Sequence, residues 1–389
     1  MINRFRGVSQ QTLTAKESAI EPARFRFRSV RLERAPEVVR FVERLGLGAL
    51  REESINSFMG RNDNWAGPTT TGAEVFVKHF GGRREDAQVR LRRVVASERL
   101  FAQDESGELR GPGLLGVDLE HRLAAFTLLP DARSGAELAS DDEFDAGLCR
   151  RVGRQLGILH ATDPEPGLID GSEHPLPSLD ELQALSLEVY AQVSAAQLES
   201  WRLIQSDAEL VAAVRRLRAA EDAAGERRPI HGDLRLDQFL LAGDELYLGD
   251  WEELRLGDPA RDLGGFAGEW LHRAILGIPA EVSRAAGYTF GHEATHEEIL
   301  QHGAAQVAEV RPFIEACVAG YRETRERVDA GLAVRAARFA GWHTFDRMQA
   351  AAAKRMRLSA VDRASAGIGR NLLLSPESFV DLLGLGGLR

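Results

Sequence analysis

The chain has 389 residues and a mass of 42.7 kDa, more than one ordinary domain, so we expect two lobes. Hydrophobic residues make up 44% of the chain and charged residues 28%. No apolar run approaches the roughly 18 residues of a membrane span, so the composition excludes disordered and membrane-spanning proteins. The net charge of -10 argues against nucleic-acid binding, and two distant cysteines exclude a disulfide framework. The basic first residues precede no apolar stretch, which predicts a cytoplasmic protein without a secretory signal.

The order of the predicted elements divides the chain into an extension and two lobes. Residues 1–45 form an N-terminal extension with one helix over 36–45, because apolar residues recur there at helical spacing. Residues 46–130 form a small sheet lobe, with strands at 54–58, 73–78, 114–119 and 123–129, a loop over 59–72 and a helix over 83–103. Residues 131–389 form a mainly helical lobe, with helices at 142–160, 178–205, 207–224 and from 281 onward, and a hairpin of strands at 238–241 and 246–249. Together these elements predict an α+β fold.

The segment from Ile230 to Glu252 holds the most specific motif. Asp233 follows His231 and Gly232, an amide side chain follows five residues later, and Asp250 ends the second hairpin strand. This arrangement resembles the catalytic segment of aminoglycoside phosphotransferase-like kinases, which are relatives of protein kinases. The resemblance covers roughly residues 50–270. It implies a bilobal kinase-like fold, ATP and Mg²⁺ as cofactors, a nucleotide-binding N-lobe over 46–130, and a C-lobe over 131–389 that carries the catalytic loop and the acceptor-binding helices.

The same resemblance implies a role for each residue of the motif. Asp233 is the catalytic base that accepts or orients the proton of the attacking hydroxyl, and Gln238 and Asp250 are the Mg²⁺ ligands. The family usually has asparagine where this chain has Gln238, although maltokinase-like members are similar in carrying glutamine. His231 is a buried scaffold residue, and Asp262 braces the catalytic loop through backbone hydrogen bonds.

Lys78 is the expected nucleotide-phosphate ligand. It ends a predicted strand and is one of only three lysines among 49 basic residues. A compact ammonium group suits a tight phosphate site. The resemblance also implies a carboxylate partner on the following helix, and Glu98 lies on that helix's apolar face, where a charge needs a partner. Glu85 is the competitor, although its place in the first helical turn favours a solvated charge.

Two further segments are expected to contact the nucleotide. The loop after the first predicted strand would cover the phosphates, and the segment between the lobes would hold the adenine through its backbone groups. These predictions concern Gly60, Arg61, Asn62 and Asn64 in the loop, and Leu128 and Leu129 between the lobes.

A competing motif lies at His292-Glu293-Ala294-Thr295-His296, which matches the His-Glu-x2-His pattern of zinc proteases. On an unbroken helix His302 would lie about 15 Å along the axis from His292, too far to share the ion. We therefore expect a chance match, although the sequence does not decide whether His292 and His296 bind a metal.

The acceptor is indicated only by charge. Residues 331–370 contain eight basic and two acidic side chains, a local charge of +6 that would attract an acidic partner. We therefore predict that Arg355 and Arg357 bind the acceptor. The run from Gly60 to Gly67 also looks like the kinase subunits of class V lanthipeptide and thioamitide synthetases. That likeness implies phosphorylation of Ser or Thr in a precursor peptide, with a separate lyase and a separate cyclase as partners.

Two alternatives stay open at this point. A small-molecule kinase acting on an antibiotic or a sugar would use the same catalytic residues on a different acceptor. A pseudokinase-like peptide-binding scaffold would explain Gln238 as a sign of lost metal binding. The joint presence of Lys78, Asp233 and Asp250 argues against the scaffold.

Overall fold

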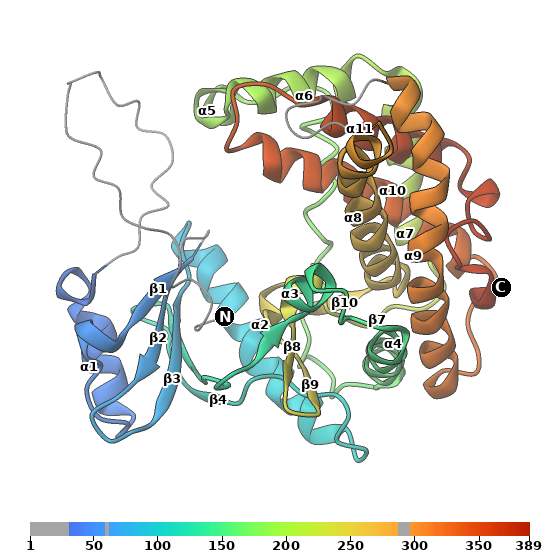
Figure 1. The fold of residues 1–389 in the computed structure, drawn as a ribbon. Coiled ribbons are helices and arrows are strands. Elements are labelled where there is room, and N and C mark those ends of the chain that lie inside the picture. The colour runs from blue at the N-terminus through green and yellow to red at the C-terminus, as the bar shows by residue number, and fades with distance from the viewer. Residues whose placement is uncertain (1–30, 59–61, 287–295) are drawn as a thin grey trace, which may run out of the picture. The chain divides into compact units, whose positions relative to one another are not determined.

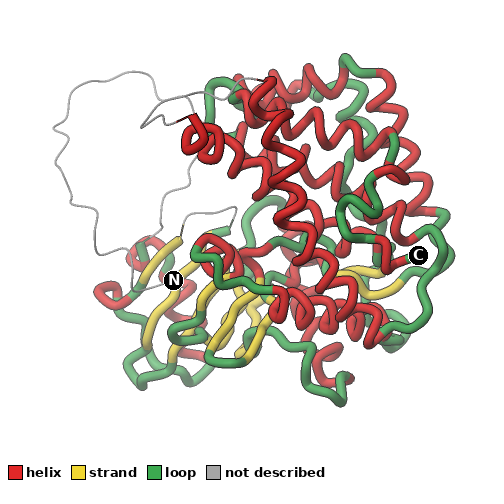
Figure 2. The backbone as a smooth tube through the Cα atoms, turned by 45° about the vertical axis from the view of Figure 1, so that its right-hand side comes forward, coloured by secondary structure: helices red, strands yellow, loops and turns green. Residues whose placement is uncertain are grey.

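The computed structural model describes residues 31–58, 62–286 and 296–389, and the chain divides into two compact units. Unit 1 contains the described residues up to 102, together with 110–138 and 237–252. Unit 2 contains 103–109, 139–236 and the described residues from 253 to the end. Helices make up most of unit 2, whereas strands make up much of unit 1 (Figure 2).

Unit 1 is built on a five-stranded antiparallel sheet in the order β1-β2-β3-β5-β4 (Figure 1). The strands are β1 (Asn56–Phe58), β2 (Asp63–Pro68), β3 (Glu74–His79), β4 (Leu114–Asp118) and β5 (Leu123–Thr127). The register places Lys78 of β3 opposite Asn64 of β2 and opposite Ala124 of β5. Residues directly opposite each other share a face of the sheet, so these three side chains point to the same side.

Two helices cover the opposite faces of this sheet. On one face, α1 (Pro36–Arg44) packs Phe41 against Val75 and Val77. On the other, α2 (Arg84–Gln103) packs Leu91 against Ala124. Because successive strand residues point to opposite faces, Lys78 lies on the α2 side of the sheet.

Strand β2 corrects the expectation of a loop over residues 59–72. Its backbone pairs with β1 on one side and β3 on the other. The Asn, Gly and Pro residues in this stretch have low strand propensity, but pairing with two neighbours overrides it.

The hairpin near the catalytic motif forms a second, three-stranded sheet of unit 1. Its strands are β6 (Arg133–Ser134), β8 (Phe239–Ala242) and β9 (Glu245–Leu248), in the order β6-β8-β9. This hairpin, which we expected within the segment 131–389, belongs to unit 1 together with β6, the strand that pairs with β8. The N–H of Gly249 donates to the carbonyl of Gln238 at 2.9 Å and aligns the two ends of the hairpin.

Unit 2 is a helical assembly with one small antiparallel pair of strands. Its helices are α4 (Ala146–Ala161), α5 (Leu187–Gln192), α6 (Ala195–Gln205), α7 (Ala208–Asp222), α8 (Ala260–Ala286), α9 (His296–Thr324), α10 (Leu332–Ala352) and α11 (Ala360–Leu374), and α3 (Gly135–Ser140) spans the boundary between the units. Strands β7 (Arg228–Ile230) and β10 (Arg255–Gly257) pair with each other. Helix α4 packs on α9, and α10 packs on α8 and α11.

The helix expected over residues 178–205 is instead two helices. Ser186 caps α5, and Ser194 forms a capping box with Gln197 at the start of α6. These side chains satisfy the first N–H groups of each helix and favour a new start there over a continuous helix. Among the described residues, no helix combines the length and apolar character needed to cross a membrane.

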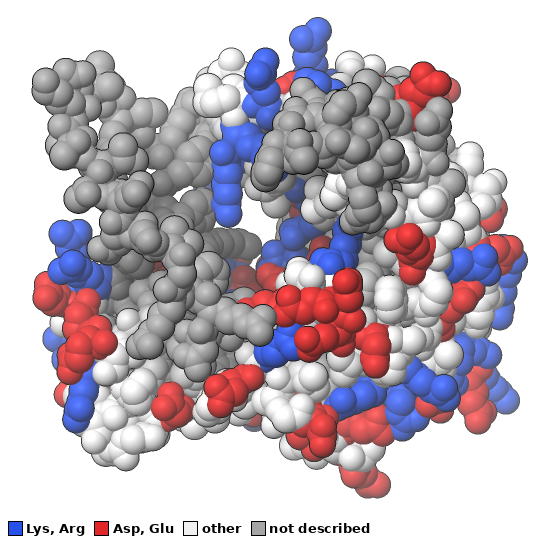
Figure 3. All heavy atoms as spheres, viewed as in Figure 1, with Lys and Arg blue, Asp and Glu red and all other residues white. Residues whose placement is uncertain are grey.

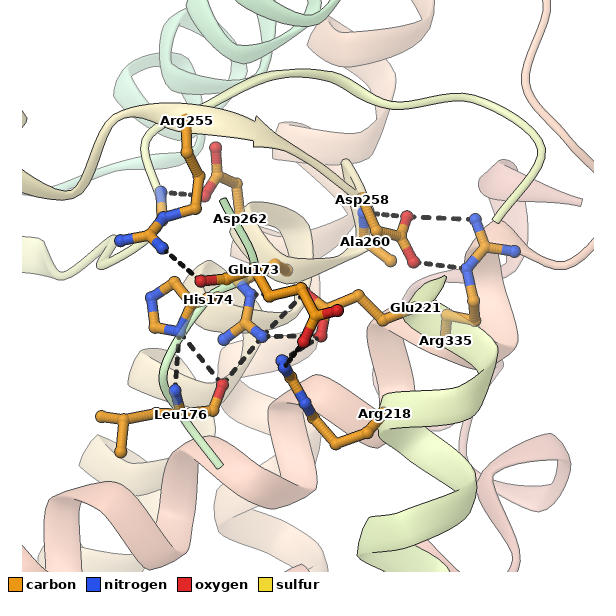
Figure 4. Close-up of polar contacts among 12 residues, drawn as sticks. Glu173, His174, Leu176, Arg218, Glu221, Arg255, Asp258, Ala260, Asp262 and Arg335 are labelled. Atoms are coloured by element: carbon orange, nitrogen blue, oxygen red, sulfur yellow. Dashed lines mark hydrogen bonds and ion pairs between the residues drawn. The ribbon is translucent and has the colours of Figure 1, made fainter. Parts of the chain in front are cut away.

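Buried ion pairs hold the chain where it enters α8. The guanidinium of Arg335 on α10 reaches both carboxylate oxygens of Asp258, at 2.6 and 3.1 Å (Figure 4). Arg261 likewise contacts Glu221 of α7 at 2.7 Å, and Glu221 also accepts from Arg218. Breaking one partner of such a buried pair is strongly destabilising, so these contacts fix the segment that follows β10.

Candidate active site

Lys78 lies between two carboxylates of unit 1. Its Nζ is 2.5 Å from Oδ1 of Asp250 and 3.0 Å from Oε2 of Glu252. Trp251, between these two acids, stacks edge-on against Phe101 of α2 and donates to the Leu248 carbonyl at 2.7 Å. The tryptophan therefore anchors the short segment that presents both carboxylates to the lysine.

The charge on Lys78 is stabilised by these neighbours. Burial alone would lower the pKa of Lys78, but the charges of Asp250 and Glu252 and their hydrogen bonds hold it above its usual value. The lysine therefore stays protonated at neutral pH and offers a fixed positive charge.

The expected pairing of Lys78 with Glu98 is not found. The Glu98 carboxylate accepts a hydrogen bond from the backbone of Leu114, and burial raises the pKa of Glu98. Glu85, the competitor in the first turn of α2, is exposed. The Asp-Trp-Glu segment of unit 1 supplies the partner instead, because both of its acids already reach Lys78.

The predicted metal ligands lie at the two ends of the β8–β9 hairpin. The backbone hydrogen bond between Gly249 and Gln238 brings residue 238 next to the chain that leads into Asp250. Asp250 has a φ of +63°, an unusual conformation for a residue other than glycine and one often found at functional sites. A carboxylate and an amide oxygen are the hard ligands that Mg²⁺ prefers, so the donor set fits this ion.

The loop residues predicted to cover phosphates make hydrogen bonds within unit 1 where they are described. Asn62 is buried, and its side chain bonds to Glu252 and to the N–H of Gly81. The Asn64 side-chain amide donates to the carbonyl of Asn62 at 3.1 Å. Asn62 therefore links separate segments of unit 1 through hydrogen bonds. Gly60 and Arg61 lie outside the described residues.

The backbone groups expected to hold adenine are partly engaged within unit 1. The N–H of Leu128 donates to the Glu74 carbonyl at 3.1 Å, and the carbonyl of Leu129 accepts from Ala132 at 3.4 Å. The Leu128 carbonyl and the Leu129 N–H are therefore the backbone groups that we expect to bind adenine.

In unit 2, Asp233 lies on a loop that one buried carboxylate organises. Asp262 accepts hydrogen bonds from the N–H groups of His231, at 2.7 Å, and Gly232, at 2.9 Å. Gly232 has a φ of +87°, and a Cβ there would lie 2.7 Å from the Glu253 carbonyl, so this position requires glycine. The half-buried Asp233 follows directly, and its position is set by the backbone of the loop.

His160 of α4 supports Asp262 from the other side. Its Nε2 lies 3.1 Å from Asp262 Oδ2, and its Nδ1 lies 3.2 Å from the hydroxyl of Tyr321. Burial opposes ionisation of Asp262, but His160, His231 and the loop N–H groups together hold the pKa of Asp262 below its usual value. The sequence did not single out His160, because it is an isolated residue at the end of a helix far along the chain.

A second carboxylate, also missed from the sequence, contacts the loop three residues after Asp233. Glu269 of α8 accepts from the N–H of Leu236 at 3.3 Å, and its other oxygen lies 2.6 Å from His343 Nε2 on α10. Burial opposes the ionisation of Glu269, but His343 and Arg347 lower the pKa of Glu269 to about 2. Helix α8 is thereby joined to the loop that carries Asp233.

The two predicted acceptor-binding residues line one cavity of unit 2. This cavity has a volume of about 640 Å³ and is bounded by Leu276, Arg355, Arg357, Leu358, Ser359, Val361, Asp362 and Arg363. Figure 3 shows basic side chains at the top of the view, where Figure 1 places α6 and α11. Glu269, His272 and Leu276 follow one another at helical spacing on α8, so a single face of this helix leads from the catalytic loop to the cavity.

Acids elsewhere in unit 2 balance much of the +6 charge of residues 331–370. Arg363 pairs with Glu199, and Arg370 pairs with Glu209 at 2.6 Å. Within the segment, Arg355 pairs with Asp362 at 2.7 Å. Within the described residues Arg357 makes no ion pair. The basic character of the cavity is therefore local and centres on Arg357.

The zinc-protease motif is only partly described. His292 lies outside the described residues, and His296 begins α9. Among the described residues, no group of three or more His, Cys, Asp or Glu side chains is placed to hold a metal ion.

Comparison with known proteins identifies a family. The model of the phosphotransferase enzyme family (APH) matches residues 60–298, more than half of the chain. No curated protein matches the sequence.

Solved structures with similar folds include several kinases. The structure of amicoumacin kinase in complex with AMP-PNP, Ca²⁺ and Ami has a TM-score of 0.56 and 10% identity, covering 87% of this chain and 93% of that one. The ADP-bound aminoglycoside phosphotransferase APH(2'')-Ib has a TM-score of 0.49 and 12% identity, covering 87% of this chain and 99% of that one. The macrolide 2'-phosphotransferase from Brachybacterium faecium has a TM-score of 0.45 and 17% identity, covering 85% of this chain and 97% of that one. With the family match, the first of these confirms the predicted α+β kinase-like fold.

Proposed function

Because the chain belongs to the phosphotransferase enzyme family, we propose that it uses ATP and Mg²⁺ to phosphorylate a hydroxyl group. The observation that carries this proposal is the buried Lys78, held at hydrogen-bond distance from Asp250 in a segment that also carries Gln238. Nucleotide phosphates are bound by a fixed positive charge that lies next to oxygen ligands for a divalent cation.

Each residue has one task in the proposed reaction. Lys78 binds nucleotide phosphates, and Asp250 and Gln238 would hold Mg²⁺, which when bound neutralises phosphate charge. Asp233 accepts the proton as the acceptor oxygen forms its bond to the γ-phosphorus. The bond from that phosphorus to the β–γ bridging oxygen breaks, and ADP leaves. Asp262 positions Asp233 through the loop backbone.

The proposed acceptor bears a negative charge and is extended. Its hydroxyl would lie near Asp233, and its anionic group would lie near Arg357 in the cavity. Glu269, beside the catalytic loop, and Leu276, at the cavity, are seven residues apart on α8, or roughly 10 Å along the helix. An extended peptide covers that distance in about three residues, which supports Ser or Thr of an acidic precursor peptide as the acceptor. In that case a separate lyase would eliminate the phosphate and a separate cyclase would act next.

The second candidate acceptor is a small anionic alcohol. The cavity volume of about 640 Å³ lies within the range of small-molecule pockets and favours this alternative. The amicoumacin kinase structure contains Ami together with AMP-PNP, although an identity of 10% shows only that the fold is similar.

Reversal of one charge tests whether the cavity binds the acceptor. We expect Arg357→Glu to raise KM for an acidic Ser-containing peptide by about tenfold, with kcat nearly unchanged, because the charge contributes binding rather than chemistry. Arg355 is a poorer choice, since it pairs with Asp362, which completes the capping box of Ser359 at the start of α11. Phosphorylation is read by mass spectrometry at two salt concentrations, because a peptide drawn by charge loses affinity as salt rises.

The matched control changes an equal charge elsewhere on unit 2. Arg216 is exposed on α7 and lies outside the cavity, so Arg216→Glu should leave KM for the peptide unchanged. Equal KM values for the Arg357 and Arg216 variants would contradict binding of the peptide at this cavity. If the protein phosphorylates a small anionic alcohol but no peptide, the result would favour the second candidate.

A further inference from the structure

One carboxylate of unit 1 contacts three elements at once. Oε2 of the buried Glu252 accepts from Asn62 Nδ2 at 3.1 Å, lies 3.0 Å from Lys78 Nζ and lies 3.5 Å from Arg90 Nη1. The carbonyl of the same residue accepts from Arg93 at 3.3 Å. Glu252 thus joins the metal-site segment to the start of β2, to β3 and to α2.

Arg90 completes this arrangement from the helix. Its side chain is fully buried on the sheet-facing side of α2. It donates to Asn62 Oδ1 at 3.3 Å and to the carbonyl of Gly81. The ring of Phe80 lies 5.3 Å from the Lys78 ammonium and 5.7 Å from the Arg90 guanidinium. One aromatic ring therefore supports both cations.

The charges run in the opposite order from the one expected for a kinase. A direct pair would place a glutamate of the helix against Lys78. Here the buried face of α2 presents Arg90 and Arg93, and the carboxylate comes from the segment after Asp250. The lysine is thus connected to α2 through an intermediate acid.

We infer that Glu252 is the positioning residue for Lys78, and that Arg90 is the residue through which α2 holds Glu252 in place. This inference rests on the proposed function, since Lys78 is taken to bind nucleotide phosphates. Glu252 acts through Lys78 and is not assigned any contact with substrate.

The arrangement gives Lys78 a partner that is independent of the metal ligand. Asp250 is needed for Mg²⁺, and a buried ammonium left without a carboxylate is strongly unfavourable. With Glu252 present, Asp250 can serve the metal while Lys78 remains paired. Without the charge of Glu252, Lys78 would compete with Mg²⁺ for Asp250.

This competition yields a signature that loss of stability alone would not produce. We expect Glu252→Gln to raise the Mg²⁺ concentration that gives half-maximal ATP binding by about five-fold or more, because the metal must displace Lys78 from Asp250. Glu252→Asp keeps the charge and should recover part of the effect. The binding of ATP is measured by calorimetry over a Mg²⁺ series, together with the melting temperature of each variant.

The helix side of the inference is tested through Arg90. Because Arg90 is fully buried, Arg90→Met leaves its buried partners unpaired and is expected to fold poorly. Arg90→Lys serves as the second variant, because it keeps the charge but lacks the forked contact. We expect Arg90→Lys to shift the Mg²⁺ midpoint in the same direction as Glu252→Gln. The double variant should shift it by less than the product of the two single effects, since both act through one contact.

Glu98→Gln is the matched control, because it removes a half-buried carboxylate on the same helix that does not reach Lys78. Its Mg²⁺ midpoint should equal that of the unchanged protein. If Glu252→Gln gives the same midpoint as Glu98→Gln while the unchanged protein binds ATP, the inference is overturned and the proposed function stands. If the unchanged protein binds no ATP at any Mg²⁺ concentration, the proposed function fails and the inference fails with it.

Discussion

The charged groups of the two units are organised in different ways. In unit 1, Lys78 pairs with both Asp250 and Glu252, and Arg90 also contacts Glu252, so the four charged groups form one cluster. In unit 2, Arg335 and Arg370 pair with acids far away along the chain, and the loop of Asp233 is held by backbone hydrogen bonds to Asp262. The comparison teaches that convergence of charges marks the proposed ligand site, whereas most ion pairs of unit 2 support the fold.

The largest expected effect comes from a change of Asp233, the proposed base. Asp233→Asn should lower kcat by about a thousandfold, because a positioned general base contributes about 10²–10⁴ to the rate. The Kd for ATP should be unchanged, since Asp233 belongs to the acceptor side of the reaction. Steady-state kinetics and calorimetry measure the two quantities. Asp222→Asn, an exposed acid at the end of α7, is the control, and an Asp233 variant as active as this control would remove Asp233 as the base.

A structural ion pair of unit 2 should affect stability instead of catalysis. Arg335→Met leaves the buried Asp258 without its bidentate partner and should lower the free energy of unfolding by about 3 kcal/mol or more. Arg370→Met breaks an ion pair whose arginine is one-third exposed and should cost less than about 1 kcal/mol. Urea denaturation measures both. Equal losses would show that burial does not separate the two kinds of pair.

Acid should expose a smaller effect near the catalytic loop. Burial lowers the pKa of His272 to about 4, and Glu269, His343, Arg347 and Asp362 are the charged groups around it. Since an unfolded histidine titrates near 6.5, the unfolded state binds a proton that the folded state does not between these values. Stability is therefore fully present above pH 6.5 and falls as the pH drops toward 4.

The control for this prediction is a variant that lacks the titrating imidazole. His272→Gln removes the group, so its melting temperature should fall less between pH 6.5 and pH 4 than that of the unchanged protein. Identical pH profiles for the two proteins would show that His272 does not contribute to acid sensitivity.

The sequence predicted those parts of the site that depend on spacing along the chain. Asp233, Gln238 and Asp250 lie within one short motif, and Lys78 follows the apolar run Val75-Phe76-Val77 that predicts a strand. Glu252 was missed because a single acid after a motif has no periodic signal. Arg90 did carry a signal, since a charge on the same face as Ala87, Leu91 and Val94 requires a buried partner.

The charge of the C-terminal helices shows why local sequence has limits. Residues 331–370 are strongly basic as a segment, but the acids that balance Arg363 and Arg370 are Glu199 and Asp207, more than 150 positions away. Only the fold brings these partners together. The same applies to His160, which reaches Asp262 across 102 positions.

The most direct test of the central claim is the binding of ATP to the unchanged protein and to Asp250→Ala, each with and without Mg²⁺. The account predicts that Mg²⁺ tightens binding to the unchanged protein by about tenfold or more and has little effect on the variant, because Asp250 supplies the carboxylate ligand. Calorimetry gives the four dissociation constants. Binding of ATP that is equally tight in all four titrations would contradict a metal-dependent nucleotide site at Asp250 and would favour a scaffold that binds without catalysis.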